Sequence, residues 1–300
     1  AARDLYPSYV EALAEVTGTL VPLNRGGILD LAFDEAEADA RRAQLTAAQR
    51  WLTSDEVHAL EPAIGPAVGA VFHPDDGAVD NVVLMRVLRE LVDASSTVTV
   101  VHDRVTGLDL ETDRPLIQLA SRRTMIASTV VLAAGAWTPS IEGIPRPLPI
   151  EPVRGQLYSV GSAPVRHVTY GADGYVVPRR GGHTVVGATM ENVGFEIGVT
   201  ADGMSALAET ARRIAPSLAT ARILERWSGL RPVTPDLLPI IGPDPDHPSV
   251  LYACGHSRNG ILLGPLTGEC IAALASGELP GLDLSPFSIE RFTGLAVTSI

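Results

Sequence analysis

The sequence has few of the residues that cross-link a chain or anchor it in a membrane. Only two cysteines, Cys254 and Cys270, occur among 300 residues, and they form no CxxC pair. We therefore expect neither a disulfide framework nor a zinc site, and a reducing, cytoplasmic compartment fits best. No apolar run approaches the roughly 20 residues that cross a bilayer. The first 18 residues are amphipathic and do not resemble a secretory leader.

Basic residues are also in the minority. The 23 lysines and arginines face 35 aspartates and glutamates, which gives a formal net charge of −12. Nucleic-acid binding normally requires a basic face, so this balance argues against a nucleic-acid partner. Hydrophobic residues make up 46% of the chain, which is enough core material for two domains.

The first half of the chain predicts mixed α/β structure. Apolar residues at helical spacing and good N-caps predict helices at residues 1–18, 34–49, 53–62 and after Asp80. Strands are predicted at 26–31, 97–101, 116–120 and 125–134, with a connecting loop or hairpin at 65–77. The segment 125–134 is almost continuously apolar, as in a strand buried on both faces of a parallel sheet. Small residues follow it at 133–136, and they let a backbone approach a helix or a cofactor closely.

From residue 150 onward the pattern changes to short alternating strands. Segments 175–178 and 183–188 flank a glycine-rich turn and predict a hairpin. Helices are predicted at 201–214 and 266–276, and Pro265 would occupy the first helical position of the second one. The positive end of that helix dipole would then stabilise negative charge on a bound group, unless the segment is an ordinary join between a loop and a helix. We expect a doubly wound layer interleaved with an antiparallel layer.

Two arginines lie in apolar, glycine-rich surroundings. Arg231 and Arg258 each need an anion, because a buried guanidinium without a partner is costly. The partner is either a protein carboxylate, such as Asp236 or Glu225, or the carboxylate of a ligand, which the planar guanidinium binds with two hydrogen bonds. A tyrosine at a strand start, Tyr175, favours the ligand.

Several ordered motifs resemble the D-amino-acid oxidase superfamily, and within it the glycine oxidases. The matching segments are residues 77–80, 133–137, 175–179, 186–191, 229–232 and 255–263. The resemblance implies an FAD-binding doubly wound sheet with an antiparallel substrate domain. The FAD-binding domain would comprise residues 1–18, 76–147 and 226–300, and the substrate domain residues 19–75 and 148–225.

The same resemblance implies a set of site residues. Arg231 would pair with the substrate carboxylate, assisted by the Tyr175 hydroxyl and with Arg258 in the same pocket. The residues implied to lie near FAD are Val105, Ala133, Ala134, Gly135, Trp137, Gly155, Gln156, His256, Arg258, Asn259, Gly260, Ile261 and Leu262. We expect His256 to be packed within its loop and not to act as an acid or base.

The strand–GxGxxG–helix unit with which the family opens has no match here. The pair Gly26-Gly27 comes too late and lacks the third glycine. We expect the N-terminal βαβ unit to be missing from these 300 residues, which would then bind FAD weakly when expressed alone.

The implied reaction is FAD-dependent oxidative deamination of glycine and other small amino acids, such as sarcosine and D-alanine. Hydride transfer to the flavin would give an imine or 2-oxo acid, ammonia or an amine, and hydrogen peroxide from dioxygen, in thiamin biosynthesis. The FAD would be non-covalent, because residues 232–238 contain no cysteine, and the protein would be a homo-oligomer without a metal. The alternatives are a sarcosine oxidase, a D-amino-acid dehydrogenase, an inactive fragment, or an anion-binding domain without redox chemistry.

Overall fold

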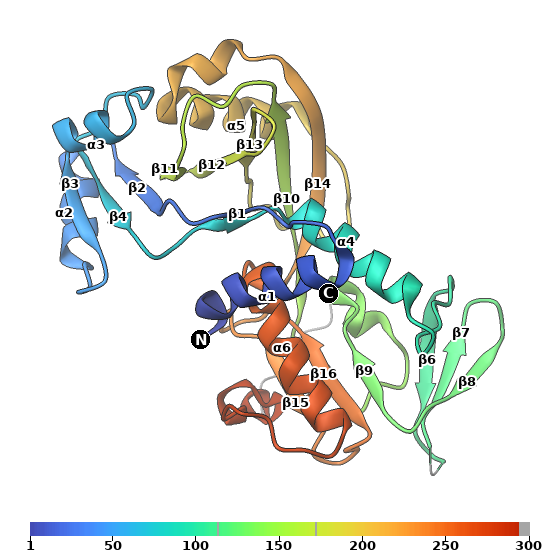
Figure 1. The fold of residues 1–300 in the computed structure, drawn as a ribbon. Coiled ribbons are helices and arrows are strands. Elements are labelled where there is room, and N and C mark those ends of the chain that lie inside the picture. The colour runs from blue at the N-terminus through green and yellow to red at the C-terminus, as the bar shows by residue number, and fades with distance from the viewer. Residues whose placement is uncertain (113, 172, 294–300) are drawn as a thin grey trace.

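The computed structural model describes residues 1–112, 114–171 and 173–293, which form two lobes joined by an extended ribbon (Figure 1). The upper lobe is built on an eight-stranded sheet of order β14-β10-β13-β12-β11-β2-β4-β3. The β11–β2 pair is parallel and the other pairs are antiparallel. Its strands are β2 (Ile28–Ala32), β3 (Arg50–Thr53), β4 (Gly69–His73), β10 (Glu151–Val160), β11 (Val168–Gly171), β12 (Gly174–Arg179), β13 (His183–Gly187) and β14 (Ile223–Val233).

Helix α5 (Ala201–Ile214) packs on one face of this sheet. Its residues Leu207 and Ile214 join Leu29 and Leu31 of β2 in the largest buried core. Helices α2 (Glu35–Ala43) and α3 (Ser54–Leu60) flank the outer strands (Figure 1).

The described part of the lower lobe contains two three-stranded sheets, three α-helices and the short 3-10 helices η1, η3 (Ser285–Phe287) and η4 (Ile289–Phe292). One sheet has the order β15-β16-β9, and the other has the order β6-β7-β8. Helices α1 and α6 contact each other, and α1 also contacts α4 (Figure 1). The elements are α1 (Ala2–Thr17), α4 (Asn81–Ala94), β6 (Val105–Asp109), β7 (Leu116–Leu119), β8 (Thr124–Ile126), β9 (Val130–Leu132), η1 (Gly135–Ser140), β15 (Ile240–Pro243), β16 (Val250–Cys254) and α6 (Gly260–Ala275). The ribbon between the lobes pairs β1 (Leu23–Asn24) with β5 (Ala78–Val79).

The predicted helix starts are confirmed where a cap fixes them. Thr53 and Glu56 form the reciprocal capping box of α3, and the Asp80 carboxylate accepts hydrogen bonds from the first turn of α4. Helix α5 has the predicted bounds, because the Thr200 hydroxyl accepts a hydrogen bond from Gly203 N at its start. Helix α1 ends at Thr17 and is capped by Gly18, whose backbone is left-handed with a φ of 71°.

Two of the predicted strands differ from the strands in the structure. Residues 97–101 form no strand, and the exposed side chains of Val98 and Val100 show that no sheet covers them. The predicted strand 125–134 is divided between β8 and β9. Val131 is 41% exposed while Leu132 is buried, because successive side chains point to opposite faces and only one face of β9 is covered. The prediction of a strand buried on both faces was therefore wrong.

Other bounds shift. Helix α2 ends at residue 43, six residues earlier than predicted, and the segment 65–77 contains β4. Helix α6 begins at Gly260, so Pro265 lies inside it and not at its first position. The long strand β14 was not predicted, and it crosses the expected domain boundary between residues 225 and 226. Within the described part of the chain, no helix is both long and apolar enough to span a membrane.

Candidate active site

Strands β10 and β14 position Arg231 over a glycine. Arg231 lies opposite Val153, and Gly155 lies two residues further along β10. A Cβ atom placed on Gly155 would come within 2.4–2.6 Å of three atoms of the Arg231 guanidinium. The guanidinium therefore lies close against the strand in the space that the missing side chain leaves. One of its nitrogens donates a hydrogen bond to the Thr189 carbonyl at 3.0 Å.

Tyr175 occupies a similar position over Gly187. The two residues face each other across β12 and β13, and a Cβ atom on Gly187 would lie 2.7 Å from the Tyr175 hydroxyl oxygen. The Tyr170 ring packs beside Tyr175 with 5.3 Å between ring centroids. Burial raises the pKa of Tyr175, although the charges of Arg231 and Arg258 oppose this rise. At neutral pH the hydroxyl is protonated and can donate a hydrogen bond to an anion.

Arg231 and Arg258 share this region without a protein carboxylate. Burial lowers the pKa of Arg231, and the positive charge of Arg258 adds to this lowering, while Tyr175 opposes it. Among the described residues, neither arginine forms a salt bridge. Two cations that lack a counter-charge and repel each other favour an anionic ligand between them.

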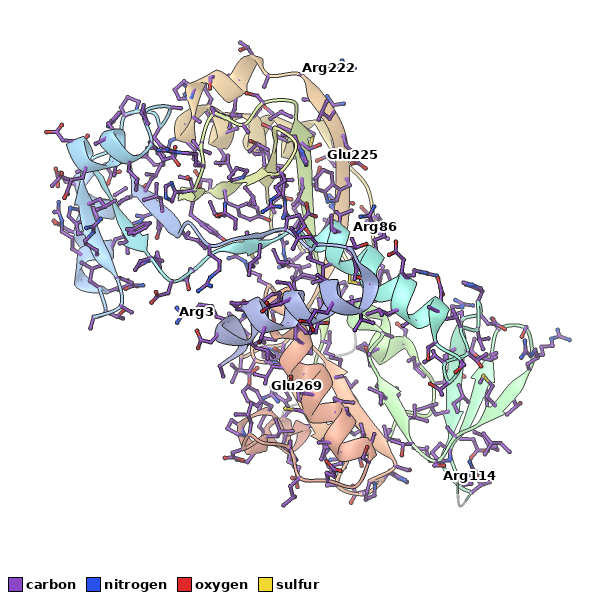
Figure 2. The ribbon with its side chains drawn as sticks, in the orientation of Figure 1. Arg3, Arg86, Arg114, Arg222, Glu225 and Glu269 are labelled. Atoms are coloured by element: carbon purple, nitrogen blue, oxygen red, sulfur yellow. The ribbon has the colours of Figure 1, made fainter. Side chains whose placement is uncertain are left out.

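The protein carboxylates considered as partners lie elsewhere. Asp236 pairs with Arg291 at 2.7 Å. Glu225 is exposed, and Figure 2 shows it pointing outward, like Arg222, from the β14 edge of the sheet. The interpretation of Arg231 and Arg258 as partners of these carboxylates was therefore wrong.

A second set of predicted residues gathers at one edge of the lower sheet. Strands β9 and β16 are parallel, so their carboxyl ends meet at the same edge. Ala133 and Ala134 follow β9 and are exposed, and Gly135 has a φ of 58° with nothing within 4 Å of a Cβ placed on it. Residues 255–259 follow β16 and lead into α6. Ligands of open α/β sheets bind at such an edge.

The start of α6 adds hydrogen-bond donors to this edge. No side chain caps the helix at Asn259, and Gly260, Ile261 and Leu262 are all exposed. Their N–H groups and the positive end of the helix dipole suit an electron-rich group. Because the helix begins at Gly260 and not at Pro265, the positive end of its dipole lies at Gly260, Ile261 and Leu262, which the family resemblance implied to lie near FAD.

These observations fit FAD at the interface of the two lobes. The small, exposed backbone of Ala133 to Gly135 leaves room for a phosphate-bearing chain, and the uncapped donors of α6 suit the flavin oxygen and nitrogen atoms. The Tyr6 hydroxyl donates a hydrogen bond to the Ile261 carbonyl, so α1 holds the first turn of α6 in place.

Three other residues predicted to lie near FAD, Gln156, Val105 and Trp137, lie apart from this group. Gln156 neighbours Gly155 in β10 and so faces the opposite side of the sheet. Its side chain is fully buried under α5, where its amide nitrogen donates to Glu191 at 2.7 Å and to Thr200 at 2.9 Å. The structure does not bring this side chain to the Arg231 face.

Val105 begins β6, in a different sheet from β9 and β16, and is 37% exposed. Trp137 is 47% exposed, and its ring lies 6.0 Å from that of Phe195 in the loop between β13 and α5. His256 lies 3.0 Å from the Thr267 hydroxyl, and burial lowers the pKa of its imidazole. This contact agrees with a packed, neutral histidine.

Two residues of the site were not predicted from the sequence. The Thr189 carbonyl orients Arg231, and Tyr170 packs against Tyr175. A strand predicted before residue 175 would have identified Tyr170, because it lies opposite Tyr175 across β11 and β12 and aromatic residues in such positions often pair.

Comparison with known proteins agrees with this architecture. The family model described as FAD dependent oxidoreductase, abbreviated DAO, matches residues 2–274. A glycine oxidase of Pseudomonas putida is 33% identical, and the alignment covers 98% of this chain and 82% of that protein. The crystal structure of glycine oxidase from Geobacillus kaustophilus superimposes with a TM-score of 0.89 at 31% identity, covering 97% of this chain and 81% of that one.

A longer relative also matches. The bifunctional protein ThiO/ThiG of Trichormus variabilis is 33% identical over 99% of this chain, but the chain spans only 46% of that protein's length. The match of the family model over most of the chain, together with the glycine oxidase relatives, establishes the family. The chain belongs to the DAO family of FAD-dependent oxidoreductases.

Proposed function

We propose that this oxidoreductase oxidises glycine and other small primary or secondary amino acids, including sarcosine and D-alanine. The observation that carries the proposal is the pair Arg231 and Arg258, which forms no salt bridge within the described residues and acts electrostatically on the Tyr175 hydroxyl. An amino-acid carboxylate satisfies both guanidinium groups and accepts a hydrogen bond from the tyrosine. The glycine oxidase names of the relatives support the same substrate class.

The division into domains is part of this proposal. The lobe of the eight-stranded sheet would be the substrate domain, since Tyr175 and Arg231 lie on its strands. The lobe of β9, β16 and α6 would hold FAD through Ala133, Ala134, Gly135 and the first turn of α6. The FAD would be non-covalent, because residues 232–238 contain no cysteine.

The residues of the site mainly bind and orient. Arg231, fixed by Thr189 and Gly155, would hold one end of the substrate, and this fixed geometry accounts for much of the rate. Bound FAD supplies the chemistry that a protein lacks, accepting two electrons as the substrate Cα–H bond breaks. Neither guanidinium group nor a tyrosine with a raised pKa is a base at neutral pH. The substrate would therefore have to bind with its amine already neutral.

Dioxygen is the proposed electron acceptor, with hydrogen peroxide as product and thiamin biosynthesis as the pathway. The alternative is a dehydrogenase of the same family, which would pass its electrons to another acceptor. We also propose that the protein is a homo-oligomer and that it is located in the cytoplasm.

Peroxide release from glycine, sarcosine and D-alanine, measured with the FAD-loaded protein, tests this function. We expect peroxide with at least one of the three, and an Arg231→Ala variant should lose affinity for it about 100-fold, as expected when a charge-assisted pair is lost. Reduction of an artificial electron acceptor without peroxide would favour the dehydrogenase. Unchanged glycine affinity in the Arg231→Ala variant would contradict the carboxylate site.

A further inference from the structure

A cavity lies beside the ribbon that joins the two lobes. It has a volume of about 530 Å³ and lies between the β1/β5 ribbon, the segment before β11 and the turn that joins β12 to β13. None of the residues that line it belongs to the predicted substrate or FAD site. Its chemistry therefore requires a separate explanation.

Four arginines line this cavity: Arg25, Arg166, Arg179 and Arg180. Among the described residues that line the cavity, Asp80 is the only acidic one. Its carboxylate already accepts hydrogen bonds from Val82 N at 3.1 Å and Val83 N at 3.2 Å at the start of α4. The cavity thus has an excess of three positive charges in a chain whose net charge is −12.

No carboxylate neutralises these arginines. Within the described residues, none of the four takes part in a salt bridge. Neutral acceptors orient two of them: Arg179 donates to the Val79 carbonyl at 2.6 Å and to the Asn81 side chain at 2.9 Å, and Arg166 donates to the Leu60 carbonyl at 2.6 Å.

These contacts orient two of the four guanidinium groups, and their acceptors carry no negative charge. Burial lowers the pKa of Arg179, although Asp80 and Tyr175 oppose the shift, as expected for a cation held partly out of water. Arg25 and Arg180 are exposed and form no hydrogen bond through their guanidinium groups within the described residues, so both can turn toward a ligand. Oriented cations without a counter-charge favour a bound anion.

We propose that this cavity binds the diphosphate group of a small molecule. Guanidinium groups bind phosphate oxygens with paired hydrogen bonds, and the chain has no lysine, so all 23 of its cations are arginines. A terminal phosphate group carries about −1.5 to −2 charge at neutral pH, and the inner phosphate of a diphosphate adds about −1, so a diphosphate comes close to balancing the excess of three. Leu23, Val165 and Pro178 add apolar lining, and the volume lies in the range of about 300 to 1,000 Å³ for small-molecule sites.

Isothermal titration calorimetry on the FAD-loaded protein at physiological salt tests the site. The ligands are inorganic pyrophosphate, uridine diphosphate and orthophosphate. We expect both diphosphates to bind, and orthophosphate to bind at least tenfold more weakly. Tighter binding of uridine diphosphate would identify an organic diphosphate as the ligand, and equal binding would identify pyrophosphate itself.

A double variant, Arg25→Gln with Arg180→Gln, should weaken diphosphate binding by about 100-fold, roughly tenfold for each charge-assisted contact. Both side chains are exposed, so the thermal unfolding temperature should not change. The matched control is Arg222→Gln, which removes an exposed arginine that lies just before β14 (Figure 2) and should leave binding unchanged.

Three results would overturn the proposal. They are no binding of either diphosphate, equal affinity in the double variant and the unaltered protein, or equal affinity for orthophosphate. Release of flavin upon addition of a diphosphate, followed by its absorbance, would also overturn it, because the ligand would then occupy the cofactor site. None of these measurements depends on oxidation of an amino acid.

Discussion

Replacement of Gly155 by alanine should impair substrate binding and leave the fold intact. A Cβ atom at this position would lie 2.4 Å from a guanidinium nitrogen of Arg231, and the guanidinium must move by about 1 Å to reach ordinary contact. The clashing atoms are the far end of a flexible side chain, so the backbone of β10 does not need to move. The variant loses the hydrogen bond from Arg231 to the Thr189 carbonyl, which lowers the free energy of unfolding by about 1 kcal/mol.

The functional effect should be much larger than this loss of stability. A displacement of about 1 Å in a group that orients a substrate costs on the order of 100-fold in rate. We therefore expect kcat/KM for the best amino-acid substrate to fall about 100-fold, with a rise in KM because the carboxylate is bound in the ground state as well. Steady-state kinetics and urea unfolding of the same preparation measure the two effects.

A matched control separates the clash from the added methyl group. Gly161 lies just beyond β10, and a Cβ atom added there would have its nearest neighbour at 3.5 Å, which is ordinary contact. Gly161→Ala should therefore leave both kinetics and stability nearly unchanged. Full activity in Gly155→Ala would refute the reasoning, since Arg231 would then not need its observed position. A large loss of stability would also refute it, because the clash would have reached the backbone.

Three further predictions concern single groups. Tyr175→Phe removes a donor to the substrate carboxylate and should raise KM about tenfold, with little change in stability; unchanged KM would remove Tyr175 from the site. The pH profile of kcat/KM should rise through the pKa of the substrate amine, because neither the two arginines nor Tyr175, the described residues proposed to contact the substrate, can deprotonate it, and a profile that is flat through that pKa would contradict this. Asp244 is fully buried and accepts hydrogen bonds from Arg146 at 2.6 Å and the Tyr252 hydroxyl at 2.8 Å, so Asp244→Asn should lower the free energy of unfolding by about 3 to 5 kcal/mol. Burial alone would raise the pKa of Asp244, but Arg146, Tyr252 and two backbone N–H groups lower it overall. Its contribution is therefore present above its ordinary pKa and lost as the pH falls through its lowered pKa, and urea unfolding of Asp244→Asn should lack this part of the acid dependence.

The elements that the sequence predicted well are those with local signals. The Thr53 capping box, the Asp80 N-cap and the apolar spacing of 201–214 each act within a few residues, so no distant contact could override them. Helix α6 was predicted to begin too late because Pro265 was interpreted as a helix start. The helix in fact begins at Gly260, and the Tyr6 hydroxyl of α1, which is distant in sequence, donates a hydrogen bond to the Ile261 carbonyl of its first turn.

The missed strand β14 has a different cause. Gly229 and Pro232 suggest a turn, but β14 is the edge strand of its sheet and pairs with β10 alone. An edge strand tolerates proline, because a missing N–H can face away from the partner strand. The sequence therefore identified Arg231 as important without showing the strand that positions it.

The packing of the site could not be predicted from the sequence either. Gly155 and Arg231 are 76 positions apart in sequence numbering, and the register of β10 against β14 brings them together. Similarly, the alternation of side chains along β10 separates Gly155 from Gln156, although both were expected near the flavin. Predicting such contacts requires the strand register, which local patterns do not determine.

Anaerobic mixing of the FAD-loaded protein with glycine or with methylamine tests the central claim most directly. The two compounds differ by the carboxylate that Arg231 and Arg258 are proposed to bind. Glycine should bleach the yellow absorbance of the flavin within one turnover, and methylamine at the same concentration should not. Equal bleaching by both compounds, or no bleaching by glycine, sarcosine or D-alanine, would contradict the account.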